Sequence, residues 1–69
     1  MSNLNKYIYT QYNDSYVIGV IIIDYGSHFI YNALETNSHY VVGCNYYGFL
    51  DKTIIADSLD QLNKLRVFQ

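Results

Sequence analysis

The side chains best suited to chemistry are two histidines and one cysteine: His28, His39 and Cys44. An imidazole beside a thiol can generate a nucleophilic thiolate. His39 and Cys44 lie on or next to one expected strand, where five residues span roughly 17 Å and an odd separation places side chains on opposite faces. They cannot pair within that strand, and His28 could approach Cys44 only across strands. We therefore predict that the protein is not an enzyme.

Neither a metal site nor a cofactor is predicted. A metal ion needs three or four converging ligands, and Asp24, His28, His39 and Cys44 show neither CxxC nor HxxxH spacing. The carboxylates lie mostly in expected turns or at the expected helix start, where structural roles account for them. The chain also lacks a glycine-rich phosphate loop and a Walker-type lysine.

The length of the chain sets limits on its architecture. Its 69 residues form at most one domain, 1–69, and a core of this size is marginal. Small domains usually rely on a disulfide, a metal or self-association. Cys44 is the sole cysteine, which excludes an internal disulfide and suits a reducing compartment such as the cytoplasm.

Charge and hydropathy exclude two classes of partner. The net charge of −2 does not suit a protein that holds long nucleic acids. The longest apolar run, residues 16–23, is far shorter than the roughly 20 residues of a membrane-spanning helix. The N-terminal stretch also lacks the layout of a signal peptide. We expect a cytoplasmic protein with no membrane partner, and we do not expect it to bind nucleic acid.

Five segments rich in β-forming residues predict strands. They span residues 5–12, 16–24, 28–35, 40–47 and 52–56. The third segment could turn helical near its end. Connections of two to four residues favour antiparallel hairpins, so the strands should form a meander, and Gly26 can adopt a positive φ in one of the turns.

One helix is predicted over residues 57–66. Ser58 can cap its N-terminus, and Gln61 three residues later completes a capping box. A narrow apolar stripe is formed by Leu59, Leu62 and Leu65. The fold class is therefore α+β: a small antiparallel sheet of four to five strands, either open or curled into a half-barrel, with one C-terminal α-helix packed on one face.

The strand over residues 16–24 is apolar on both faces. An antiparallel strand covered on one face should alternate apolar and polar residues. A helix of ten residues is only about 15 Å long, so it can cover one face of a few strands. Either the sheet curls to bury the second face, or another copy or another protein covers it.

Aromatic residues point to a contact surface. The chain has nine Tyr and three Phe, and tyrosine is enriched at protein interfaces. Alternation along a strand places one of Tyr46 and Tyr47 in the core and the other outside with Phe49. Tyr7 and Tyr9 share a face of the first strand and could extend this surface. The predicted partner-binding residues are Tyr7, Tyr9, Tyr46, Tyr47 and Phe49.

These features predict a non-catalytic protein-binding module that self-associates or binds a larger bacterial host protein. Asn, Ile, Tyr and Lys, whose codons are AT-rich, supply 27 of the 69 residues. In this respect the chain resembles proteins of phages and mobile elements of low-GC bacteria, which suggests an inhibitor of a host enzyme or defence protein. The alternative is a binder or sponge of a small nucleotide signal that stacks on tyrosines. A structural subunit of a phage particle or a plasmid regulator also remains open.

Overall fold

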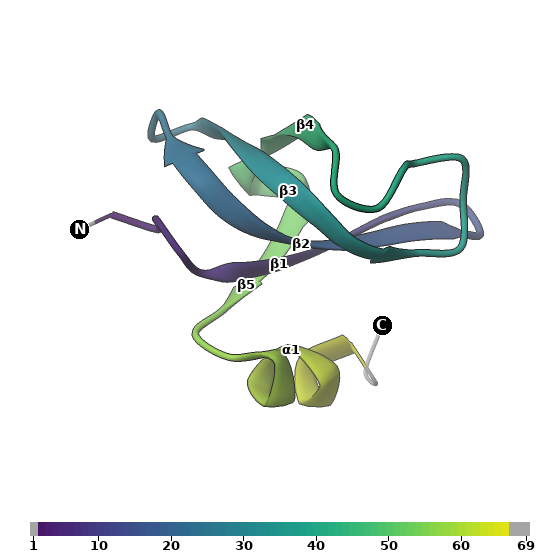
Figure 1. Cartoon of the computed structure of the whole chain (residues 1–69). Helices are drawn as coiled ribbons and strands as arrows, with labels where there is room; N and C mark the ends of the chain where they lie inside the picture. The colour runs from purple at the N-terminus through teal and green to yellow at the C-terminus, as the bar shows by residue number, and fades with distance from the viewer. Residues whose placement is uncertain (1, 67–69) are drawn as a thin grey trace.

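A computed structural model describes residues 2–66 and shows a five-stranded antiparallel sheet followed by one helix (Figure 1). The strands are β1 (Tyr7–Tyr12), β2 (Ser15–Asp24), β3 (His28–Thr36), β4 (Asn45–Phe49) and β5 (Thr53–Ala56). A short 3-10 turn, η1 (Leu50–Lys52), joins β4 to β5, and the helix is α1 (Leu59–Arg66). The predicted α+β class, with the helix packed on a small antiparallel sheet, is confirmed.

The sheet is curled because of how its two edge strands are connected. The strand order is β4-β3-β2-β1-β5, so β4 and β5 lie at opposite edges. In a flat sheet they would be about 19 Å apart. The link from Phe49 to Thr53 reaches at most about 14 Å, and the Thr53 hydroxyl donates a hydrogen bond to the Phe49 carbonyl at 2.8 Å. The sheet is therefore a half-barrel.

An open seam separates β4 from β5. Within residues 2–66, β4 pairs only with β3, and β5 pairs only with β1. The register between β2 and β3 shifts at Ile18/Gly19 and again at Ile21/Ile23. Such bulges bend a strand and increase its twist, which lets β2 follow the curl.

Two separate apolar clusters cover the two faces of β2. The inner cluster fills the half-barrel and consists of Ile8, Val17, Ile21, Phe29, Tyr31 and Ala33. The outer cluster lies under α1 and consists of Tyr9, Ile18, Ala56 and Leu62. The curl of the sheet thus buries one face of β2, and the helix covers part of the other. Ile22 and Ile23, at the far end of β2, are 38% and 41% exposed.

The N-terminus of α1 follows its prediction closely. The Gln61 N–H donates to the Ser58 hydroxyl at 3.1 Å, as in a capping box. The Gln61 side-chain carbonyl accepts from the N–H of Asp57, one residue before the cap. The leucine stripe is narrower than predicted: Leu62 is fully buried, whereas Leu59 and Leu65 are about 40% exposed. The helix therefore contacts the sheet mainly through one leucine.

Several predicted strand boundaries are wrong. The fourth strand was expected from residue 40, but β4 begins at Asn45 because Gly43, at φ +92°, turns the chain sharply. The first strand begins at Tyr7, because Asn5 has φ +68°. The fifth begins at Thr53, after η1. The third strand stays extended to Thr36 and does not turn helical.

Candidate functional site

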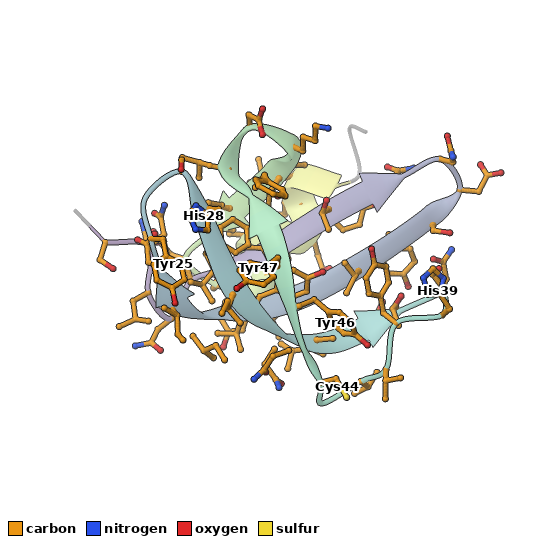
Figure 2. All side chains as sticks on the ribbon, turned by 90° about the horizontal axis from the view of Figure 1, so that it is seen from above. Tyr25, His28, His39, Cys44, Tyr46 and Tyr47 are labelled. Carbon is orange, nitrogen blue, oxygen red and sulfur yellow. The ribbon has the colours of Figure 1, made fainter. Side chains whose placement is uncertain are left out.

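The three reactive side chains lie far apart. His28 is half-buried at the start of β3, whereas His39 and Cys44 are exposed in the connection between β3 and β4. Figure 2 shows the three at separate places on the molecule. Among residues 2–66, no three His, Cys, Asp or Glu side chains come together in a way that could hold a metal ion. In this arrangement, Cys44 does not pair with His28 or with His39.

Tyr46 and Tyr47 point to opposite faces of β4. Tyr46 is half-buried against the inner cluster, and its hydroxyl accepts a hydrogen bond from the Val41 N–H at 2.8 Å. Its ring meets that of Tyr40 edge-on, with the ring centres 4.9 Å apart. Tyr47 is 68% exposed. Tyr46 therefore holds the connection between β3 and β4 in place, and Tyr47 is free to contact a partner.

Tyr7 and Tyr9 do not extend the surface around Tyr47 and Phe49. Tyr9 is 7% exposed in the cluster under α1, where its ring stacks on Tyr16 at 5.7 Å. Tyr7 packs against the same cluster. Both belong to β1, which is separated from β4 by two strands, β3 and β2. Since α1 occupies this part of the outer face, the two tyrosines support the helix.

An uncovered aromatic surface lies on the outer face of the β2–β3–β4 side of the sheet. Its members, named the outer patch from here on, are Ile23, Tyr25, His28, Ile30, Tyr47 and Phe49. Cross-strand pairing puts them on one face, because Ile30 lies opposite both Ile23 and Tyr47, and His28 lies opposite Phe49. Figure 2 shows Tyr25, His28 and Tyr47 together; because the sheet is curled, this part of its outer face points away from α1.

His28 is the centre of the outer patch. Its ring stacks on Tyr25 with the ring centres 4.9 Å apart and 22° between the planes. The ring centres of Tyr47 and Phe49 each lie 6.5 Å from it. Tyr25, Tyr47 and Phe49 are all more than half exposed. Exposed apolar clusters of this kind mark interaction surfaces in small proteins.

Sequence reasoning identified Tyr47 and Phe49 but missed Tyr25 and His28. Both lie beside the turn at Gly26, where a positive φ was anticipated and φ is +98°. The Tyr25 N–H donates to the His28 carbonyl at 2.9 Å, which brings the two rings together. The signal was present in the sequence: two ring-bearing residues flank a tight turn, at positions that a hairpin places close together.

A cavity of about 250 Å³ opens at the seam of the half-barrel. This cavity is named the seam cavity, and the residues that line it include Thr10, Val17, Tyr31, His39, Tyr40, Tyr47, Phe49 and Lys52. Burial, together with the nearby Tyr40 and Tyr46, raises the pKa of Tyr31 to about 12. The Tyr31 hydroxyl is therefore neutral at physiological pH and can donate a hydrogen bond.

No protein-family model, curated protein or solved structure matches the chain. Within residues 2–66, no helix has both the length and the apolar character needed to cross a membrane. Among residues 2–66, the outer patch and the seam cavity are two open surfaces suited to binding.

Proposed function

We propose that the protein is a non-catalytic binding module that attaches to a larger bacterial protein through the outer patch. One observation carries the proposal: α1 covers the outer face over β1 and β5, and leaves the aromatic half of the same face exposed. Burying a large apolar side chain is worth roughly 1.5–3 kcal/mol. Several such side chains gathered on one face are a strong reason for a partner to bind there.

The composition of the outer patch suits the centre of an interface. Interface cores are rich in aromatic residues and poor in charged ones, and a few well-packed anchors supply most of the binding energy. Tyr47 and Phe49 are the most exposed rings of the patch, and no Lys, Arg, Asp or Glu belongs to it. A standard interface buries roughly 800 Å² on each partner, on a chain whose whole surface is 4655 Å². The patch is then the core of a larger contact.

The partner is a bacterial host protein, and the module inhibits it by occupying its surface in the host cytoplasm. The AT-rich residue usage, with Asn, Ile, Tyr and Lys in 27 of 69 positions, supports an origin in a phage or mobile element. A binding surface without a catalytic constellation is sufficient for an inhibitor that acts by steric block. The partner's matching surface is apolar at its centre, with polar groups placed to meet the hydroxyls of Tyr25 and Tyr47.

A second copy of the chain is the competing occupant of the outer patch. Sedimentation of the purified protein between about 10 µM and 1 mM distinguishes the two, because self-association follows mass action. A monomer throughout this range supports a different protein as the partner. A dimer that the double substitution Tyr47→Ser/Phe49→Ser dissociates would replace the proposal with homodimerisation.

The decisive experiment compares capture by matched variants. The wild-type protein, Tyr47→Ser/Phe49→Ser and the control Val42→Ser are immobilised and exposed to bacterial lysate. Val42 is 60% exposed but lies outside the patch. We expect the wild type and the control to retain one specific protein, which the double variant loses. Retention of the same proteins by all three, or of none by any, would refute the proposal.

A further inference from the structure

The seam cavity lies between β4 on one side and residues of β1 and β2, such as Thr10 and Val17, on the other. Val17 and Tyr31 of the inner cluster line it, together with Tyr40 from the connection between β3 and β4. Lys52, at the end of η1, also lines it. The cavity is therefore built from segments far apart in the sequence, and it uses the inner face of the sheet. Tyr47 and Phe49 of the outer patch also line the cavity along β4, so the two sites meet at this strand.

Unpaired backbone groups of β4 face the seam. The Leu50 N–H donates to the Ser27 carbonyl at 3.1 Å. In an antiparallel pair, hydrogen-bonded positions alternate, so Gly48 and Tyr46 also bond to β3. The N–H and C=O of Tyr47 point the other way. Because Tyr47 also lines the cavity, one backbone donor and one acceptor are available at its edge.

The hydroxyl of Tyr31 forms no hydrogen bond with the described residues and is not fully buried. Tyr31 is only 1% exposed, and its hydroxyl makes no hydrogen bond to the part of the chain that the structure describes. In that same part of the chain, every fully buried side-chain oxygen or nitrogen has a hydrogen-bond partner. The small exposed area of Tyr31 therefore includes its hydroxyl, which opens onto the cavity that the residue lines. A ligand with a hydrogen-bonding group would satisfy it.

The charge of the cavity favours an anion. Lys52 and His39 line it, and no Asp or Glu does so among the described lining residues. The chain as a whole carries six acidic residues and only four Lys and Arg. A cavity that contains a lysine and excludes every carboxylate is thus a local exception in an acidic protein. A single cation suits a ligand with one anionic group.

The walls of the cavity favour a planar ring. The Tyr40 ring lies parallel to His39, at 5.2 Å and 13°, and Tyr31 contributes a second ring. Aromatic side chains stack on flat ligands irrespective of the ligand's exact identity. The volume of about 250 Å³ is slightly below the range of typical drug-sized pockets, roughly 300–1,000 Å³. It accommodates one ring system with a short charged substituent.

We propose that the seam cavity binds a small aromatic anion, with its ring against Tyr31 and Tyr40 and its anionic group at Lys52. This goes beyond the proposed protein-binding function, because it assigns a second site, for a small molecule, that meets the outer patch at β4. Both a nucleoside monophosphate and an aromatic carboxylate have the required chemistry. These are two different kinds of ligand, and the experiment below shows which of them the cavity binds.

Ligand-observed NMR and thermal unfolding test the proposal with defined probes. The anionic probes are uridine monophosphate and 4-hydroxybenzoate, and their neutral counterparts are uridine and 4-hydroxybenzyl alcohol. We expect at least one anionic probe to raise the unfolding midpoint and to bind at least about tenfold more tightly than its neutral counterpart. Whichever anion binds more tightly shows whether the cavity prefers a nucleoside monophosphate or an aromatic carboxylate. Absence of binding by both anions at 5 mM, or equal binding of anion and neutral counterpart, would overturn the proposal.

Two variants locate the site. Lys52→Gln removes the cation from an exposed position and should weaken the bound anion about tenfold or more. Tyr40→Leu removes a ring wall and should weaken the anion and its neutral counterpart alike. Lys64→Gln, on the exposed face of α1, is the matched control and should leave the affinity unchanged. An effect of Lys64→Gln equal to that of Lys52→Gln would show nonspecific charge attraction and refute the site.

Discussion

Phe29 and Gly48 face each other across the β3–β4 pair so closely that β4 has no room for a side chain at this position. A Cβ placed on Gly48 would overlap Cε1 of Phe29 and lie 2.7 Å from its Cζ, and the Phe29 ring is fully buried. This contact allows β4 to fold over the inner cluster. It thereby determines that its neighbours Tyr47 and Phe49 lie on the outer face.

Gly48→Ala should destabilise the fold by about 1–3 kcal/mol, because the added methyl group forces the Phe29 ring out of a packed position. Urea unfolding measures the change. Gly26→Asn is the control: nothing lies within 4 Å of a Cβ at Gly26, and Asn tolerates positive φ better than most residues. We expect a smaller loss there. An unchanged unfolding midpoint for Gly48→Ala would mean that β4 does not pack on Phe29 in solution.

Neighbouring tyrosines of β4 should respond differently to substitution. Tyr46→Leu removes the hydroxyl that accepts the Val41 N–H and the edge-on contact with Tyr40, so it should cost about 1–2 kcal/mol. Tyr47→Ser should change stability by less than about 0.5 kcal/mol, since the ring is 68% exposed. Denaturant unfolding of both variants tests this. Equal losses would indicate that the faces of β4 are assigned wrongly.

The three leucines of α1 should also differ. Leu62→Ala removes the only fully buried one and should cost about 2–5 kcal/mol, much of the stability of a domain this small. Leu59→Ala and Leu65→Ala should each cost less than about 1 kcal/mol. Circular dichroism with urea unfolding compares the three. If all three variants lose the same stability, the helix packs through the whole stripe that the sequence predicted.

Local patterns were sufficient to predict the first hairpins and the helix. β2, its turns and the Ser58 cap follow from alternation, turn residues and capping chemistry, all of which act within a few residues. The start of β4 was not predicted, because 40–44 are rich in β-forming residues while Gly43 adopts φ +92°. The pairing of β1 with β5, which curls the sheet, joins segments more than 40 residues apart. No local pattern carries that information.

The candidate site was predictable to a similar degree. Alternation in β4 assigned Tyr47 and Phe49 to one face, because strand geometry alone determines it. The positions of Tyr7 and Tyr9 under α1 depend on which strands the helix crosses, and that follows from the curl. The seam cavity depends on the same curl. It therefore could not be located before the strand order was known.

The carboxylate of Asp24 should titrate below its usual range. Its pKa is lowered mainly by the hydrogen bond from the Asn3 N–H, at 2.7 Å, and next by the one from the Gly26 N–H, at 2.8 Å. Because the folded-state pKa lies below the unfolded value, this stabilisation is present above about pH 4 and is lost as the pH falls through the folded pKa. NMR titration of the carboxyl carbon measures it. A pKa at or above 3.8 would show that Asp24 does not hold the N-terminal segment.

Tyr31 should make the protein sensitive to alkaline pH in a defined window. Burial raises its pKa from 10.0 to about 12, and the nearby Tyr40 and Tyr46 add to the effect. Below pH 10 both the folded and the unfolded states keep the phenol neutral, so this stabilisation is complete. Between about pH 10 and 12 only the unfolded state ionises, and the stabilisation is progressively lost.

The substitution Tyr31→Phe removes the ionising group, so the difference in unfolding free energy between wild type and variant should change across this window and be constant below it. A constant difference from pH 8 to 12 would show that the Tyr31 hydroxyl reaches bulk water, and the seam cavity would then be wider than described.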